Sequence, residues 1–176
     1  MKTIVLSGCP LALPSLQYLS ETGRLTALIC PAASCADDKA PLEQWAGETG
    51  VPCWSIGEGE LEKDLTELIS ETQPGLVLVF GFPYSLPAAF LETARPRCWN
   101  MHFSLQPERV GTVTLYALAQ GREARHLQEE SITITSDPAA ASPLNQLSLQ
   151  AVSLLKTGLS QVRAESYIER YFSSCA

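Results

Sequence analysis

The first part of the chain alternates between short apolar runs and segments with the spacing of amphipathic helices. Runs in which nearly every residue is apolar are typical of strands buried on both faces of a parallel sheet. Such strands are predicted, the third of them brief and at an edge, over residues 3–7, 25–30, 51–54 and 75–80. Because a helical segment lies between each strand and the next, the pattern predicts right-handed βαβ units and a parallel sheet covered on both faces.

Proline and glycine mark the ends of the helices between these strands. The first helix is predicted to begin near Pro14, since proline is favoured at the first helical position, and to stop at Gly23. After a polar loop over 31–39, a second helix is expected to open at Pro41 and to end at Gly50. The third helix carries apolar residues at positions i, i+4, i+7 and i+8, namely Leu61, Leu65, Leu68 and Ile69.

The pattern is less regular after residue 80. Residues 81–87 mix aromatic side chains with helix breakers and predict a loop, followed by a short helix over 87–91. A further strand then carries an Asn-x-His sequence, and we expect a loop and a helix after it, in a segment that ends at Gly121. A charged loop leads to alternating residues over 131–135, which indicate a strand with one face in water. The last predicted helix is marked by Leu144, Leu147, Ala151, Leu154 and Leu155.

The domain organisation expected from these elements is one domain over residues 1–158 and an extension over 159–176. A chain of 176 residues can bury a sizeable core, and no repeat or linker divides it. We expect the extension to pack on this domain or on a partner, including a second copy in a homodimer, through Tyr167, Ile168, Tyr171 and Phe172.

Composition narrows the classes of function. The net charge is −7 and the basic residues are scattered, which argues against a nucleic-acid partner. No run approaches the roughly 18 apolar residues of a membrane span, and the first strand is too short for the core of a signal peptide. We therefore expect a cytoplasmic protein with no membrane contact. Six cysteines form no C-x-x-C pair, and Cys30 and Cys35 lack a second close pair, so no metal site is predicted.

Asn100 and His102 are the clearest candidates for chemistry. Two residues apart on a strand, they share one face, at the end of the sheet where open α/β folds bind their ligands. An asparagine amide can donate to a developing oxyanion, and histidine can also shuttle a proton near neutral pH. From spacing alone, such a pair is more often a structural capping or hydrogen-bonding pair than a catalytic one. His126, among charged residues, is expected to be a solvated surface residue. The first turn, over 7–10, lacks the GxGxxG pattern, which argues against nicotinamide binding.

The middle of the chain resembles the folate-dependent formyltransferases, the family that acts on glycinamide ribonucleotide, methionyl-tRNA and sugar nucleotides. The family signature is Asn-x-His, then Pro-Ser-Leu-Leu-Pro and an Arg-Gly, and the segment from Asn100 to Gly111, NMHFSLQPERVG, is similar to it. Residues 82–87, FPYSLP, are similar to the loop that holds the pterin of 10-formyltetrahydrofolate. Residues 131–134 resemble a family strand written Gly-Val-Thr-Val, and the likeness runs from about residue 1 to 155.

This resemblance implies a Rossmann-like, three-layer α/β fold with a mostly parallel central sheet and helices on both faces. It implies formyl transfer from 10-formyltetrahydrofolate to an amine of a small or carrier-bound metabolite. The catalytic residues it implies are Asn100, His102 and Asp137. The cofactor-binding residues it implies are Phe82, Pro83, Tyr84, Ser85 and Leu86, and the substrate-binding residues are Ser104 and Gly111.

Several family residues are replaced, among them the proline of the signature, where Phe103 stands. Ala140 stands where the family has an aspartate in an Asp-x-Gly-Pro-Ile setting, and Val110 stands in place of the signature arginine. Asp137 is the acid nearby, and it takes the catalytic role only if the loop is rebuilt. Two functions therefore stay open: a formyltransferase for a small or carrier-bound amine, and a catalytically impaired relative that binds folate or a protein partner. We expect no second domain for binding RNA, which favours the small or carrier-bound amine.

Overall fold

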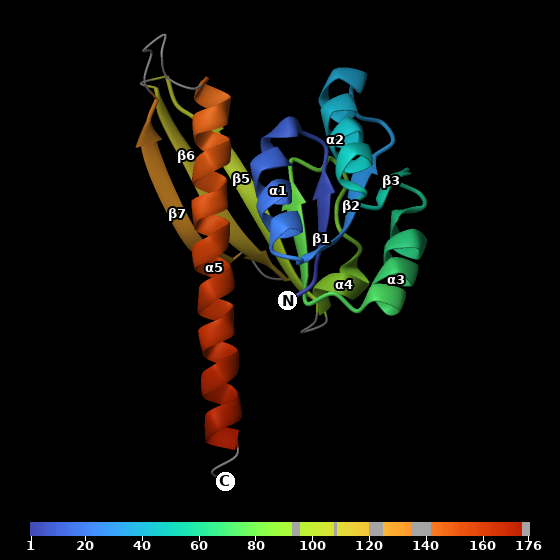
Figure 1. Cartoon of the computed structure of the whole chain (residues 1–176), viewed down its shortest axis with the longest axis vertical. Helices are drawn as coiled ribbons and strands as arrows, with labels where there is room; N and C mark the ends of the chain where they lie inside the picture. Colours follow the sequence, from blue (N-terminus) through green and yellow to red (C-terminus); the bar gives the residue numbers. More distant parts are fainter. Residues whose placement is uncertain (93–95, 108, 120–124, 135–141, 174–176) are drawn as a thin grey trace.

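A single mixed sheet in the order β3-β2-β1-β4-β5-β6-β7 organises the computed structural model (Figure 1). The strands from β3 to β5 pair in parallel, and β6 and β7 extend the sheet antiparallel. The structure describes residues 1–92, 96–107, 109–119, 125–134 and 142–173, with side chains as far as residue 165. The strands are β1 (Thr3–Ser7), β2 (Leu25–Pro31), β3 (Cys53–Ile56), β4 (Leu76–Phe80), β5 (Arg97–Leu105), β6 (Val110–Leu118) and β7 (Arg125–Thr133).

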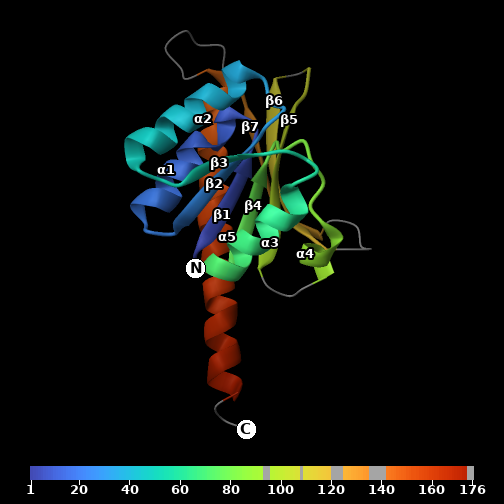
Figure 2. The ribbon, with the colours of Figure 1, turned by 90° about the vertical axis from the view of Figure 1, so that its right-hand side faces the viewer.

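Helices cover both faces of this sheet (Figure 2). One face carries α1 (Leu13–Glu21), α2 (Ala36–Thr49) and α5 (Pro143–Ser173), and the other carries α3 (Leu61–Thr72) and α4 (Ala88–Glu92). A short 3-10 turn, η1 (Pro10–Ala12), precedes α1. The predicted fold class, a mostly parallel sheet between two helical layers, is confirmed. None of the described helices is both long and apolar enough to cross a membrane.

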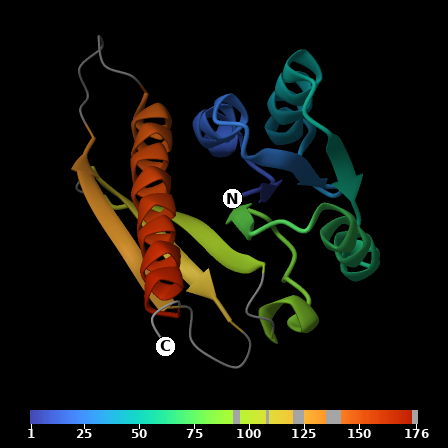
Figure 3. The same ribbon diagram turned by 60° about the horizontal axis from the view of Figure 1, so that its bottom comes forward.

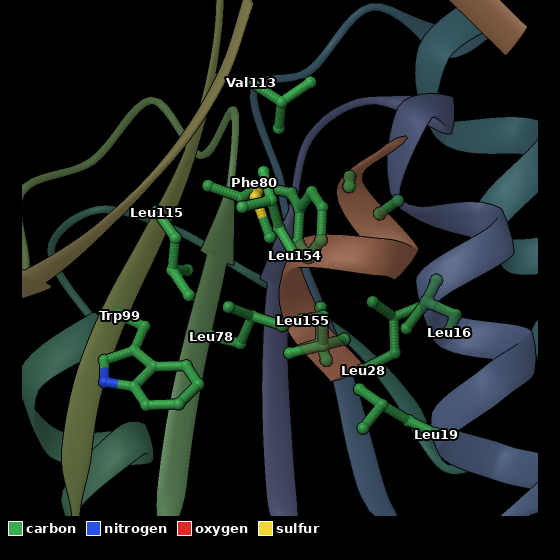
Figure 4. Close-up of a cluster of buried hydrophobic side chains, with 14 of the residues drawn as sticks. Leu16, Leu19, Leu28, Leu78, Phe80, Trp99, Val113, Leu115, Leu154 and Leu155 are labelled. Carbon is green, nitrogen blue, oxygen red and sulfur yellow. The ribbon is translucent and has the colours of Figure 1, made fainter. Parts of the chain in front are cut away.

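The larger core lies between the sheet and the layer of α1, α2 and α5. Leu154 and Leu155 of α5 are 1% and 0% exposed and lie between α1 and the strands (Figure 4). Each such leucine stabilises the fold by about 1.5–3 kcal/mol relative to an exposed one. A second core on the opposite face includes Leu61 and Leu65, as the helical spacing of α3 predicts.

The second helix begins earlier than predicted. α2 starts at Ala36, so the loop expected over 31–39 ends at Cys35, and Pro41 lies inside the helix. Asp37 and Asp38 occupy its first turn, where carboxylates interact favourably with the exposed N–H groups and the helix dipole. These polar residues were assigned to a loop, although they suit a helix N-terminus.

The segment after β5 is a strand, and the helix predicted there was wrong. A tight turn leads from β5 into β6: the Gln106 N–H donates to the Val110 carbonyl at 2.9 Å, and Arg109, at a φ of 60°, donates its N–H to the Gln106 carbonyl at 3.0 Å. β6, with the sequence VGTVTLYAL, is rich in β-branched residues, which favour a pleated surface. β7 also begins earlier than expected, at Arg125, and its charged residues suit an edge strand.

Helix α5 is longer than predicted and spans 31 residues without a break at Gly158. A Cβ added at Gly158 would lie 3.1 Å from Leu115 Cδ2 and 3.2 Å from Trp99 Cζ3, so glycine lets the helix approach the sheet closely. The first residues after Gly158 continue this packing, because Leu159 is buried and Val162 contacts the same core. Farther along, the helix projects beyond the sheet (Figures 1 and 2), and Figure 3 shows it lying against β6 and β7.

Candidate functional site

The Asn-x-His sequence lies where β5 passes the end of its neighbour β4. Asn100 pairs with Val79, and Met101 pairs with Phe80, the last residue of β4. His102 therefore begins the part of β5 that extends beyond the parallel sheet. Since the carboxyl ends of the parallel strands meet at this edge, Asn100 and His102 lie at the usual ligand-binding end of such a fold.

The side chains of β5 divide between the two faces of the sheet. Trp99 and Met101 belong to the core beneath α5, whereas Cys98 belongs to the core beneath α3 and α4. Asn100, His102 and Ser104 follow Cys98 at every second position, so they share its face. Asn100 is half-buried, while His102 and Ser104 are exposed. The predicted common face of Asn100 and His102 is therefore present, and it is open to solvent beyond Cys98.

The antiparallel neighbour β6 completes this open face. Asn100 pairs with Tyr116 and His102 pairs with Thr114. The rings of His102 and Tyr116 meet edge to face, with centroids 6.4 Å apart. Within the part of the chain that the structure describes, neither the Asn100 amide nor the His102 ring makes a hydrogen bond to another residue. Both polar groups are therefore free to bind a ligand.

A β-bulge in β7 adds two further polar side chains to the same face. Leu115 pairs with Gln128 and Tyr116 pairs with His126, so Leu127 is the extra residue. Because of this extra residue, His126 and Glu129 lie on one face, with His126 Nε2 3.7 Å from Glu129 Oε2. The alternation of a strand does not reveal a bulge, so sequence reasoning missed both residues.

The two predicted substrate-binding residues lie on opposite faces. Ser104 shares the face of His102 and is exposed. Gly111 pairs with Leu105 but is buried and turned towards α5, where it meets Leu147 and Ile134. Gly111 thus contributes to packing between β6 and α5.

The loop over 81–87 begins beside His102. Gly81 has a φ of +52°, which lets the chain turn sharply at the end of β4. Phe82 and Tyr84 are half-buried against the core under α3 and α4, with their rings edge to face and centroids 5.3 Å apart. The Ala33 N–H donates to the Tyr84 hydroxyl at 3.2 Å, which ties this loop to the loop after β2. Leu86 also packs on this core, and the exposed side chains are Pro83 and Ser85.

The turn after β1 supports the start of this loop. The Gly8 N–H donates to the Phe80 carbonyl at 3.3 Å, and a Cβ at Gly8 would lie 2.8 Å from the Gly81 carbonyl oxygen. Burial raises the pKa of the Cys9 thiol, whose Sγ lies 3.9 Å from the same Phe80 carbonyl oxygen. The carboxyl ends of β1 and β4 are therefore held together by close backbone contacts.

No family model matches the chain, but individual relatives do. Over 140 residues it is 21% identical to a methionyl-tRNA formyltransferase of Prochlorococcus marinus (strain NATL2A), which covers 70% of this chain and 42% of that protein. Over 76 residues it is 29% identical to the enzyme of the same name from a second strain of that organism, with 43% of this chain and 22% of that protein covered. The chain thus spans less than half the length of these relatives.

Solved structures share the whole architecture. A phosphoribosylglycinamide formyltransferase from Anaplasma phagocytophilum superposes with a TM-score of 0.68 at 18% identity, over 94% of this chain and 88% of that one. The chain has the formyltransferase fold. The enzyme of the same name from Streptococcus pneumoniae TIGR4 also gives 0.68, at 15% identity, over 92% of this chain and 98% of that one. A formyltetrahydrofolate deformylase from Pseudomonas putida KT2440 superposes with a TM-score of 0.60 at 16% identity, over 86% of this chain and 63% of that one. The resemblance to the folate-dependent formyltransferases is confirmed.

The described residues at this edge fit the chemistry of a formylated folate. Phe82 and Tyr84 offer half-exposed aromatic surface for a flat ring system, as small-molecule sites commonly do. Asn100 and His102, on the neighbouring strand, have free hydrogen-bonding groups that suit a formyl oxygen. Asp137 and Ala140, on which the sequence hypothesis about the catalytic carboxylate depends, lie outside the described residues of this formyltransferase fold.

Proposed function

We propose that this protein transfers the formyl group of 10-formyltetrahydrofolate to an amine of a small or carrier-bound metabolite. The observation that carries the proposal is the open pair of Asn100 and His102 at the carboxyl end of β5, beside the aromatic loop over 81–87. The fold and the sequence resemblance support the same reaction class.

The loop residues Phe82, Pro83, Tyr84, Ser85 and Leu86 would hold the folate. Phe82 and Tyr84 supply aromatic surface, and the Tyr84 hydroxyl keeps the loop in place through Ala33. When bound, the folate supplies a formyl group on nitrogen that an amine can attack. Ser104, exposed on the same face as His102, is in place to contact the acceptor.

Asn100 and His102 would stabilise the charge that develops on the formyl oxygen. The Asn100 amide donates a hydrogen bond, and the His102 ring donates one or moves a proton. A donor aimed at such a developing charge contributes about 2.7–4 kcal/mol to catalysis. Asp137 is proposed as the carboxylate that orients the histidine and manages the proton, which is a contribution of about 10²–10⁴ in rate.

The second candidate is a catalytically impaired relative that binds folate or a protein partner. Ala140, at the position where the family has its aspartate, favours this alternative. An impaired relative that binds folate differs from the enzyme in turnover, and one that binds a protein partner differs in folate binding, so these two measurements separate the candidates.

The deciding experiment is calorimetric titration with 5-formyltetrahydrofolate, a stable analogue, on wild type and on His102→Ala. We expect micromolar binding by wild type, and binding retained within about tenfold by His102→Ala because the ring-binding loop is intact. Absence of binding to wild type overturns formyl transfer and leaves partner binding. Binding without release of tetrahydrofolate from 10-formyltetrahydrofolate, across a panel of primary amines, supports the impaired relative.

A further inference from the structure

Glu129 lies on the face of His102 only because β7 is bulged at Leu127. Without the extra residue, the alternation of the strand would place His126 and Glu129 on opposite faces. With it, the His126 and Tyr116 rings meet with centroids 5.8 Å apart, and His126 Nε2 approaches Glu129 Oε2 to 3.7 Å. Bulges are enriched near active sites, where they redirect a side chain.

Thr114 connects Glu129 to the neighbourhood of His102. Thr114 is the partner of both residues, pairing with His102 on β5 and with Glu129 on β7. Its hydroxyl donates to Glu129 Oε2 at 3.1 Å, so the carboxylate lies over β6, the strand between β7 and β5. Thr114 is only 3% exposed. Since no described helix covers this part of the face, the side chains of its neighbours on the sheet must shield it from solvent.

Thr114 and His102 lie on neighbouring strands, so they are separated by one strand spacing. Adjacent strands lie about 4.8 Å apart, so a carboxylate above Thr114 is one strand spacing from the backbone of His102. The titratable side chains on this face of β5, β6 and β7, within the described residues, are Cys98, His102, Tyr116, His126 and Glu129. Glu129 is the single carboxylate among them.

Formyl transfer to an amine requires such a proton acceptor. An alkylamine is an ammonium ion at neutral pH, and its nitrogen has no lone pair for attack until one proton has left. A carboxylate beside the site attracts the ammonium ion and receives that proton.

We propose that Glu129 receives the ammonium group of the acceptor on the face of His102 and takes its first proton. The inference rests on the function proposed above and narrows the acceptor to a primary amine that is cationic before reaction. In this step an N–H bond of the ammonium ion breaks and an O–H bond forms on Glu129. The nitrogen keeps the electron pair, and Glu129, about half exposed, passes the proton to water.

The first test needs neither folate nor turnover. The chain has two histidines, so the ring Cε1–H region of its NMR spectrum contains two signals, which His126→Gln assigns. Glu129→Gln should shift both signals, since the proposed role places the carboxylate near the His102 ring as well as the His126 ring. Glu130→Gln is the matched control, because Glu130 pairs with Val113 on the other face, and it should shift neither. A Glu129→Gln spectrum in which only the His126 signal moves overturns the proposal.

The second test uses turnover of 10-formyltetrahydrofolate with ethanolamine, glycinamide and glucosamine as amine probes. Glu129→Gln should lower kcat by about 10²–10⁴, with the KM for folate unchanged within about twofold. Glu129→Asp should restore kcat to within about tenfold of wild type. Methoxyamine, whose nitrogen is uncharged at neutral pH, should lose less than about tenfold in Glu129→Gln, because it needs no initial deprotonation. A loss that is equal for charged and uncharged amines overturns the proposal.

Failure of this inference differs from failure of the proposed function. Wild type that binds no 5-formyltetrahydrofolate rejects the function, while the histidine signals still test the position of Glu129. Wild type that binds this folate but turns over with none of the amines rejects the role of Glu129. The role of Glu129 is also rejected if Glu129→Gln keeps full activity while Asp137→Asn loses about 10²-fold or more in kcat. That result assigns the proton transfer to Asp137.

Discussion

Gly111 of β6 and Leu147 of α5 are packed so closely that a Cβ at Gly111 would lie 2.6 Å from Leu147 Cδ2. The same Cβ would lie 3.0 Å from Ile134 Cδ1, so both side chains would have to move to admit it. The glycine of the signature-like segment therefore sets the distance between β6 and α5, on the face opposite His102.

Replacing Gly111 by alanine should destabilise the fold. Overpacking of a well-packed core costs about 1–3 kcal/mol, and we expect a loss of that size in the free energy of unfolding. Urea denaturation measures it. Gly47→Ala is the control, because an added Cβ there meets nothing within 4 Å and the residue lies in α2, so it should stabilise by about 0.5–1 kcal/mol. Equal stability of Gly111→Ala and wild type would remove the packing role.

The strands that lie deep in the sheet could be predicted from the sequence because burial on both faces demands continuous apolar runs. β1 has the predicted bounds, and β4 differs from its prediction only in starting at Leu76. The shared face of Asn100 and His102 follows from the two-residue period of a strand, so it was also predictable. The amphipathic spacing of Leu61 and Leu65 likewise identified α3.

The outer part of the sheet could not be predicted because pairing decides it. β6 carries its apolar side chains Val113 and Leu115 towards α5, and its short run of nine residues does not distinguish a strand from a helix. β7 is charged because it is an edge strand, which gives it the composition of a loop. The bulge at Leu127 exists only in relation to β6, so nothing in the sequence alone places Glu129 on the face of His102.

The thiols of Cys53 and Cys98 should differ in reactivity. Cys30 Sγ lies 4.0 Å from Cys53 Sγ, and a hydrogen bond from the Cys30 thiol lowers the pKa of Cys53 while raising that of Cys30. Burial raises the pKa of Cys98 to about 11. Since the thiolate is the nucleophile, iodoacetamide at pH 8 should alkylate Cys53 before Cys98, as mass spectrometry of the peptides can measure.

The pH dependence of the alkylation rates tests this assignment for Cys30 and Cys53. As pH rises, the rate for Cys53 should level off at a lower pH than the rate for Cys98, because its thiolate forms first. Cys30→Ala removes the hydrogen-bond donor, so alkylation of Cys53 at pH 8 should become slower. In urea, which unfolds the protein, the alkylation rates of Cys53 and Cys98 should become equal. An unchanged Cys53 profile in Cys30→Ala contradicts the assignment of the donor.

Replacing Tyr84 by phenylalanine should weaken folate binding without removing the ring. The hydroxyl accepts a hydrogen bond from the Ala33 N–H and so ties the loop over 81–87 to the loop after β2. A net hydrogen bond contributes about 0.5–1.5 kcal/mol, which corresponds to a rise in Kd for 5-formyltetrahydrofolate of about 2- to 12-fold. Tyr18→Phe is the control, because Tyr18 lies in α1 on the opposite face of the sheet. If both variants bind as wild type does, the loop needs no such tether.

Replacing Asn100 by aspartate should abolish most turnover while preserving the shape of the site. The side chain keeps its size but exchanges an amide donor for a carboxylate that accepts hydrogen bonds, so it repels the charge that develops on the formyl oxygen. Loss of one such donor costs about 10²–10³ in kcat, and Asn100→Asp should lose at least that much. Binding of 5-formyltetrahydrofolate, measured by calorimetry, should stay within about tenfold because the loop over 81–87 is unchanged.

Asn145→Asp is the matched control, since Asn145 is exposed at the start of α5 and the substitution makes the same change in charge. It should leave kcat unchanged. Asn100→Ala separates the loss of the donor from repulsion by the new carboxylate. If donation by the amide matters, Asn100→Ala should lower kcat by about 10²–10³, and Asn100→Asp should lower it further. Were Asn100→Ala to turn over as fast as wild type, the amide would have no part in stabilising the oxyanion, and His102 alone would have to supply that donor.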